Sequence, residues 1–390
     1  MTLQPCPYQF TPLAQTGGPL ADFAPYVAAI NDDGVVAFQA TLAPDAGGGE
    51  PATAVFLADG TGLTQVASSR DAACPVQAFV SHPDLDRAGR LTVYGPAKAG
   101  GAAVWRRGVD GSWQAVGAHG APGAFGTATG FSDIGPLGPT MNEAGAVAFR
   151  ARVPGGAACV ALAWPGDAAN VANVANVVNV ANAGPAQDQA RLIAVAGERF
   201  AAFEGLPVVN AQGKVLFRAD LVDGRQGLFL SDGSSGEPVA LVMTGASADA
   251  GPDVCAGFAE LGRFPLINDS GQVAFVGTQR DGVSGVYVLS AGRLSCLVDT
   301  RAGFQSLRGV LINNAGPVVF YGTPVGGQLG LYAGPDPVAH RLLGLGDALL
   351  GGAVAEVVLN PVSVNQRGQL AVRVALDDGR QFILRGEPQR

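Results

Sequence analysis

The chain has 390 residues, a formal net charge of −8 and only 24 Lys and Arg residues, which form no cluster. This pattern argues against nucleic acid and against anionic membranes as partners, because both bind to a basic face. Charged residues make up 14% of the chain, and its 57 glycines and 26 prolines predict many tight turns.

The start of the chain, from Met1 to Pro7, has no basic region followed by an apolar stretch, so it does not resemble a signal peptide. No run of about 20 apolar residues predicts a transmembrane helix. The cysteines are odd in number and scattered, which is typical of a reducing compartment. We therefore expect a cytoplasmic protein. The cysteines are Cys6, Cys74, Cys159, Cys255 and Cys296.

One motif recurs along the chain, with an apolar run leading into Asn-x-x-Gly and a second apolar run leading out. Asn suits the first position of a tight turn, and Gly suits a position with positive φ. The flanking runs are rich in Val and Ile, which indicates strands, so each copy predicts a β-hairpin. The copies, here called repeats 1 to 7, begin at Asn31, Asp86, Asn142, Asn210, Asn268, Asn313 and Asn365.

Each hairpin is followed by two further strand-like runs, such as Gly285–Leu289 and Arg293–Val298 after Asn268. The length from one motif to the next is that of one four-stranded unit. Four-stranded sheets repeated radially form a β-propeller. The sequence thus predicts a single all-β domain over residues 1–390, a seven-bladed propeller with four-stranded blades.

The two ends of the chain predict how the ring closes. Repeat 7 has three predicted strands, the last at Arg380–Leu384, and then the chain ends. An extra strand-like run, Tyr8–Leu13, precedes repeat 1. We expect this N-terminal strand to join the last blade as its outer strand.

Repeat 3 contains a low-complexity insertion of Val, Ala and Asn over residues 165–187. Loops absorb insertions at little cost, so we interpret it as a loop expansion. An interaction segment is the alternative.

The motif resembles that of the bacterial tandem-repeat proteins known for an Asn-x-x-Gly-x-x-Ala-Phe repeat. Ala-Phe is kept at Ala37-Phe38, Ala148-Phe149 and Ala274-Phe275 and loosened or replaced in the other copies. The resemblance covers essentially the whole chain. It implies a propeller fold and no particular chemistry, because the motif residues belong to turns and core.

Sites of chemistry are sparse. There is no nucleophile elbow, P-loop or dinucleotide fingerprint, and the three histidines make a His-rich metal site improbable. We expect neither a metal nor a cofactor. The loops between the second and third strands and the long connections at 244–262 and 346–360 share one face of the predicted propeller, so we expect function on that face.

The first candidate site is His82-Pro-Asp84, which breaks the apolar pattern of the predicted inner strand in repeat 2. Burial would raise the pKa of Asp84, and His82 could serve as an acid or base, so both are catalytic candidates. The alternative is a degenerate repeat in which Asp84 caps a turn.

The second candidate lies five residues before the motif Asn, at one mouth of the predicted channel. Two guanidinium groups there suit a carboxylate or phosphate ligand, unless they pair with acids such as Glu260 or Glu356. The candidate ligand-binding residues are Tyr26, Arg263, Arg308 and Asn360.

Three arginines, Arg150, Arg218 and Arg373, share the position just after the Phe of the motif. One residue type recurring in register predicts a structural role between blades.

The leading hypothesis is a binding protein for a small polar or anionic molecule at the channel mouth, which could also be an enzyme of the lyase, cyclase or hydrolase type by analogy of fold. The alternative is a protein-interaction scaffold that uses the looped face. Converging ionisable groups in a deep pocket favour the first hypothesis, and a broad apolar patch favours the second.

Overall fold

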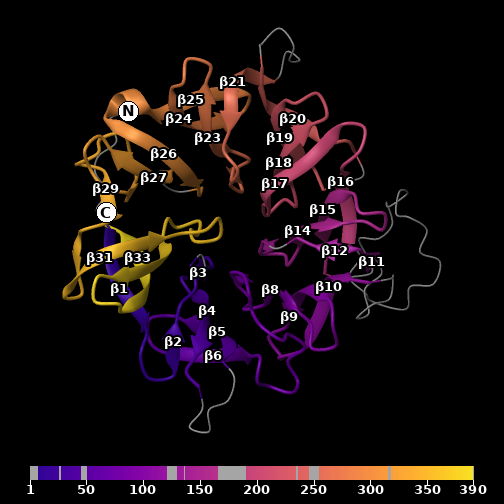
Figure 1. Cartoon of the computed structure of the whole chain (residues 1–390), viewed down its shortest axis with the longest axis vertical. Coiled ribbons are helices and arrows are strands. Elements are labelled where there is room, and N and C mark those ends of the chain that lie inside the picture. The colour runs from indigo at the N-terminus through magenta and orange to yellow at the C-terminus, as the bar shows by residue number, and fades with distance from the viewer. Residues whose placement is uncertain are drawn as a thin grey trace.

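The computed structural model describes residues 8–25, 28–44, 51–120, 130–135, 137–165, 190–233, 236–245, 254–314 and 318–389. Its regular elements there are strands, apart from one 3-10 turn, η4 (Thr300–Ala302). No helix in this part of the chain is long and apolar enough to cross a membrane. The sheets stand radially around a central axis (Figure 1), so the predicted all-β class and propeller arrangement are confirmed. The insertion predicted at 165–187 lies, beyond its first residue, outside the described residues.

Repeats 1 to 3 each form a separate sheet, in which the strands on either side of the motif turn pair antiparallel. The strands of repeat 1 are β2 (Leu20–Asp22), β3 (Ala28–Ile30), β4 (Val36–Leu42), β5 (Ala52–Ala58) and β6 (Leu63–Ser68). Those of repeat 2 are β7 (Asp84–Leu85), β8 (Leu91–Pro96), β9 (Ala102–Arg107), β10 (Trp113–His119) and β11 (Gly130–Phe131). Those of repeat 3 are β12 (Asp133–Ile134), β13 (Thr140–Met141), β14 (Val147–Arg152), β15 (Ala158–Ala163) and β16 (Ala190–Val195).

Repeats 4 and 5 share one sheet, because the last strand of repeat 4 pairs in parallel with the first strand of repeat 5. The strands of repeat 4 are β17 (Phe200–Val209), β18 (Val215–Leu221), β19 (Gln226–Ser231) and β20 (Val239–Thr244). Those of repeat 5 are β21 (Cys255–Leu261), β22 (Leu266–Ile267), β23 (Val273–Gln279), β24 (Ser284–Ser290) and β25 (Arg293–Asp299).

The N-terminal strand joins the sheet of repeat 7, as the sequence predicts. Strand β1 (Tyr8–Gln15) pairs antiparallel with the C-terminal strand β33 (Gln381–Pro388), with Tyr8 opposite Pro388. The remaining strands of repeat 7 are β30 (Ala348–Leu349), β31 (Gly352–Val358) and β32 (Leu370–Leu376). Repeat 6 consists of β26 (Phe304–Leu311), β27 (Val319–Pro324), β28 (Gly330–Tyr332) and β29 (Arg341–Gly344).

The packing of aromatic rings in the core recurs from one repeat to another. In repeat 5 the motif phenylalanine, Phe275, stacks on Tyr287, its partner in register on β24, with ring centroids 5.5 Å apart. Phe258 of the preceding strand meets both rings edge-on. Repeats 1, 4 and 6 hold the same three-ring arrangement. Such rings fill the space between neighbouring sheets and bury most of the aromatic surface.

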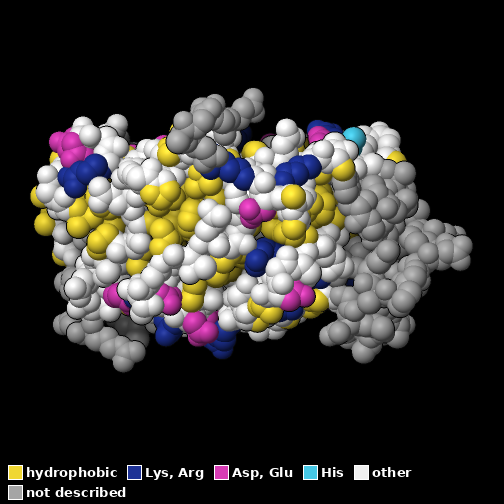
Figure 2. Space-filling view, turned by 90° about the horizontal axis from the view of Figure 1, so that it is seen from below, with side chains coloured by type: hydrophobic (Ala, Val, Ile, Leu, Met, Phe, Trp, Pro, Cys, Tyr) yellow, Lys and Arg dark blue, Asp and Glu magenta, His cyan; other side chains and the backbone are white. Residues whose placement is uncertain are grey.

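The inner strands are covered on both faces, as their consecutive apolar residues predict. Val209 packs into a core cluster with Phe217 of its own repeat, whereas Val208 packs into the next cluster with Phe258 and Phe275. Seen from the side, the outer wall exposes apolar side chains in a band, with most charged side chains nearer its two edges (Figure 2).

The side chain of the motif Asn makes hydrogen bonds both within its own turn and to the next repeat. Within its own turn, Oδ1 of Asn210 accepts hydrogen bonds from the main-chain N–H groups of Gln212 and Lys214. Across the gap between sheets, its Nδ2 donates to the carbonyl of Asn268, the corresponding residue of the next repeat, at 3.2 Å. The same link joins other neighbouring repeats, namely Asn31 to Asp86, Asn142 to Asn210, Asn268 to Asn313 and Asn365 to Asn31.

Asn210→Ala should destabilise the protein by about 2–4 kcal/mol, because it removes the two hydrogen bonds that close its own turn and the one that reaches the carbonyl of Asn268. Chemical denaturation measures this loss. Asp281→Ala is the matched control, since Asp281 caps only its own exposed turn through the N–H of Val283. Equal losses in the two variants would contradict the role of Asn210 between sheets.

Candidate functional site

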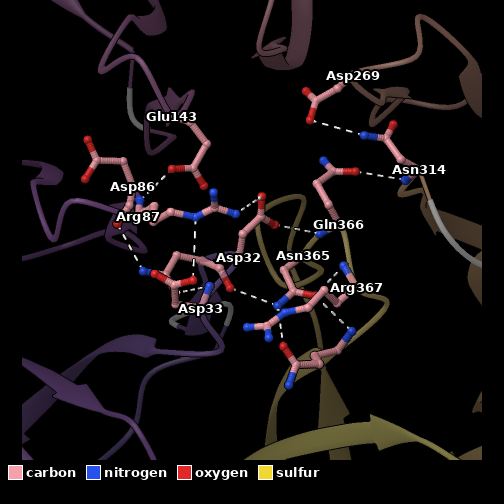
Figure 3. A network of polar contacts seen from close by, with 12 residues as sticks. Asp32, Asp33, Asp86, Arg87, Glu143, Asp269, Asn314, Asn365, Gln366 and Arg367 are labelled. Carbon is pink, nitrogen blue, oxygen red and sulfur yellow. Dashed lines mark hydrogen bonds and ion pairs between the residues drawn. The ribbon is translucent and has the colours of Figure 1, made fainter.

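The inner turns of the repeats meet at one end of the channel, where their second residues form a polar network (Figure 3). The side chain of Asn314 bonds Asp269, and the N–H of Asn314 donates to Gln366 at 2.8 Å. The N–H of Gln366 in turn donates to Asp32 at 2.8 Å. This network therefore ties repeats 5, 6, 7 and 1 together on the turn side of the channel.

Arg87 continues the network into repeats 2 and 3. Its guanidinium lies 3.4 Å from the carboxylate of Asp32 and 3.5 Å from that of Asp33. Its main-chain N–H donates to the carboxylate of Glu143 at 2.6 Å. One basic side chain thus lies within ion-pair distance of both acids of this turn, Asp32 and Asp33, and offsets one of their two negative charges.

The network is interrupted at Ala211 in repeat 4, where the side chain is a methyl group. Its N–H donates to Asp269 at 2.8 Å, but it offers no acceptor to Glu143 on its other side. Among the described residues, neither Glu143 nor Asp269 has an ion-pair partner within 4 Å. Burial raises the pKa of Glu143, and the nearby positive charge of Arg87 offsets only part of this effect.

A cavity of about 110 Å³ lies beneath these turns, inside the channel. Its walls are polar and apolar in similar measure, and four of its lining residues are acids, whereas none is basic. The acids are Asp32, Asp84, Glu143 and Asp269. The described residues contain no cluster of three or more His, Cys, Asp or Glu that suits a metal ion. The site therefore has the chemistry of a small receptor for a positively charged group.

His82 and Asp84 both lie buried at the junction of repeats 2 and 3, 6% and 5% exposed. Nε2 of His82 lies 3.1 Å from the carbonyl of Pro139. The carboxyl of Asp84 accepts hydrogen bonds from the N–H groups of Leu85 and Met141, at 2.8 and 2.7 Å. No hydrogen bond joins the imidazole to the carboxyl in the described structure, so each serves the main chain rather than an acid–base pair.

The reason for this unusual pair is Asp86, which replaces the motif Asn in repeat 2. A carboxylate cannot donate to the next repeat as the Asn amide does, and Asp86 instead binds its own Arg90 at 2.5 Å. Asp84 supplies the link between the repeats by accepting from Met141. In the described structure Asp84 thus joins two repeats through main-chain hydrogen bonds.

Three of the four predicted ligand-binding residues each contact a different partner in the described structure. Arg263 is exposed and lies 3.6 Å from Glu204, an acid of the neighbouring repeat. Arg308 is exposed and stacks over Tyr321 of its own sheet at 5.7 Å. Asn360 is buried and donates to the carbonyl of Ala28. Tyr26 lies outside the described residues.

The recurring arginines join neighbouring repeats, as predicted. Nε of Arg218 donates to the carbonyl of Leu261 at 3.2 Å, and Nε of Arg373 donates to that of Phe23 at 3.1 Å. Arg150 donates in the same way to Phe203. In repeat 6, Tyr321 fills this position and its hydroxyl donates to Leu359 at 3.1 Å.

The acids of the channel mouth were not among the site residues predicted from the sequence, although their position in the repeats could have indicated them. Asp32, Glu143 and Asp269 all directly follow the motif Asn or its equivalent. Aligning the repeats at that position shows acids in three of them and alanine at residue 211. Since the turns meet at the channel, this comparison would have predicted an acidic mouth.

The stability of the protein should fall between about pH 6.5 and 8 because of Asp84. Burial raises the pKa of its carboxyl from 3.8 to about 8 and lowers the pKa of His82 from 6.5 to about 4. Between pH 4 and 6.5 the folded state holds one proton on Asp84, and the unfolded state holds one on His82. The two states therefore bind the same number of protons, and these two groups leave the free energy of unfolding unchanged over this range. Above pH 6.5 only the folded chain keeps its extra proton, so the free energy of unfolding decreases by up to about 1.4 kcal/mol per pH unit.

Denaturant unfolding at a series of pH values measures this decline, which Asp84→Asn should abolish. Asp281→Asn, at an exposed turn, should retain it. If Asp84→Asn keeps the full decline, Asp84 is not the group responsible.

Comparison with solved structures finds distant matches, which include a β-propeller domain. TolB from Acinetobacter baumannii matches with a TM-score of 0.41 and 14% identity, over 75% of this chain and 58% of TolB. The acylaminoacyl peptidase of Pyrococcus horikoshii matches with a TM-score of 0.47 and 10% identity, over 93% of this chain and 53% of the peptidase. The β-propeller domain of the Trilobed protease from Pyrococcus furiosus matches with a TM-score of 0.36 and 11% identity, over 80% and 95% of the two chains.

The chain spans little more than half the length of the first two of these proteins. A search of curated proteins finds no significant match. One family model matches twice, over residues 12–241 and 233–381, and so covers most of the sequence. The chain therefore belongs to DUF7453, a family of unknown function.

Proposed function

We propose that this propeller binds a small molecule through a positively charged group, at the turn-side mouth of its central channel. The observation that carries the proposal is the interruption at Ala211, which leaves Glu143 and Asp269 without ion-pair partners among the described residues, above a cavity lined by both. An amine or guanidinium group bound at this interruption can donate to a carboxylate.

The electrostatics of the mouth support a cation rather than the anion expected from Arg263 and Arg308. Asp32 is already paired with Arg87, so the free negative charge lies on the side of Ala211. Each carboxylate there accepts only main-chain or amide hydrogen bonds. Charge-assisted hydrogen bonds to a ligand would therefore add to these contacts without breaking an existing ion pair.

The size of the cavity limits the ligand. A water molecule takes up about 30 Å³ in the liquid, so a cavity of about 110 Å³ accepts a group of a few heavy atoms. The apolar wall below, which includes Val208 and Met141, suits a short alkyl chain. The proposed role is binding, and no reaction step is assigned to these residues.

The proposal assumes seven blades of four main strands each. The seven motif positions support this count, as does the recurrence of the link from one motif residue to the next. An experimental density map with any other number of radial sheets would contradict it.

Binding can be followed through the methyl group of Met141, which lines the cavity. The chain has three methionines, so 13C-methyl labelling gives few signals, which Met→Leu variants assign. Propylamine and propylguanidine should shift the Met141 signal in a saturable way, whereas propionate and propanol should not. Glu143→Gln and Asp269→Asn should each weaken binding of the amine about tenfold, since each removes a charged partner.

Asp281→Asn, which removes an acid outside the cavity, should leave the affinity unchanged. Ala211→Gln should block the site, because its side chain would occupy the interruption in the network. A Met141 shift of equal size with propanol, or unchanged affinity in both acid variants, would rule out a cation site here.

A further inference from the structure

A second and larger cavity, of about 430 Å³, lies in repeat 4. It is at the other end of the strands from the Asn210 turn, because Leu221, which lines it, pairs with Phe200 at the start of β17. This volume is in the range of typical small-molecule sites. The cavity therefore lies on the face where the sequence predicted function, but not in the channel.

The floor of this cavity is apolar. Leu221, Phe229, Ala240 and Met243 all line it. Phe229 is fully buried, and Met243 is 5% exposed. The polarizable thioether and the aliphatic side chains suit an apolar group of aryl size.

The guanidinium of Arg199 is held over this floor. Its central carbon lies 5.0 Å from the ring centre of Phe229 and 5.1 Å from that of Phe200. Nη1 donates to the carbonyl of Pro238 at 3.1 Å and lies 3.6 Å from the carboxylate of Glu237, whose side chain is 93% exposed. Among the described residues, Nε and Nη2 have no polar partner. The aromatic contacts thus fix the plane of a guanidinium that still has donors to offer.

The other charges of the rim leave Arg199 as the group available to an anion. Asp223 binds Arg225 at 2.7 Å, and hydrogen bonds from Arg225 hold the pKa of Asp223 below its usual range, so this pair neutralises itself. The remaining acid of the lining, Glu198, is exposed and adjoins Arg199 in sequence.

We infer that this cavity binds a small carboxylate with an apolar body, the carboxylate on Arg199 and the body on Met243, Leu221 and Ala240. Two kinds of molecule share this chemistry, simple aryl or alkyl carboxylates and apolar amino acids. In an amino acid the ammonium group would lie near Glu198. The inference is independent of the channel site, since the two cavities share no residue.

The methyl signal of Met243 tests the inference in the sample that serves the channel experiment, because Met243 lines this cavity and Met141 lines the other. Three probes with the same ring distinguish the charges: 3-phenylpropanoate, phenylalanine and phenethylamine. We expect the two carboxylates to shift Met243 in a saturable way and the amine to leave it unshifted. A shift with only one carboxylate supports the inference and identifies which kind of molecule is bound.

Arg199→Gln should weaken carboxylate binding about tenfold or more, as expected for the loss of a charge-assisted hydrogen bond. Arg308→Gln is the matched control, because Arg308 is also exposed and stacked on an aromatic ring, over Tyr321, but lies outside the cavity. Ala240→Phe should block binding by filling the floor. In Arg199→Gln the response of Met141 to propylamine should be unchanged, which separates this site from the channel site.

The inference is overturned if no probe shifts Met243, if phenethylamine shifts it as strongly as the carboxylates, or if Arg199→Gln binds them as the unsubstituted protein does.

Discussion

The architecture depends on the side chain of the motif Asn, which makes two kinds of hydrogen bond. The motif Asn closes its own turn through its carbonyl oxygen and holds the next repeat through its amide. Neither Asp nor Ser offers both an acceptor and an amide donor of this reach. Because each link is made at the innermost point of the ring, these contacts fix the distance between neighbouring turns and hence the width of the channel.

The junction of repeats 2 and 3 shows what happens when this side chain is changed. Asp86 keeps the turn, since its carboxylate accepts from the N–H of Arg90 at 2.8 Å. It cannot hold the next repeat, and the link is made instead by Asp84 and by Arg106, which donates to the carbonyl of Gly145 at 3.0 Å. As a consequence, the carboxyl of Asp84 is buried and its pKa lies near 8. A change of one atom type in the motif thus explains the two residues that looked most like a catalytic pair.

The sequence predicts what is local and repeated. The Asn-x-x-Gly turns, the inner strands and the pairing of Tyr8–Gln15 with the last strand follow from short patterns and from strand counting. Contacts between repeats are different, because they join residues far apart in the sequence, such as Tyr321 and Leu359, which are 38 positions apart. Glu204 lies near Arg263 only because repeats 4 and 5 lie side by side.

The two cavities were beyond sequence analysis for a further reason. The channel mouth is acidic because of residues that follow the motif, and none of them is unusual in its own turn. The cavity of repeat 4 has Arg199 stacked on Phe229 at its edge, one residue in the turn before β17 and the other on β19. Only the pairing of β17, β18 and β19 brings the guanidinium over the ring.

The antiparallel pairing of β1 with β33 has a mechanical consequence. Tyr8 lies opposite Pro388, so the two free ends of the chain leave this pair at the same end. A force that pulls the termini apart would therefore load the hydrogen bonds one after another, like a zip, and not all together as in shear. The propeller would open first where β1 pairs with β33. The outermost strand would separate while the hydrogen bonds between the inner turns remained intact.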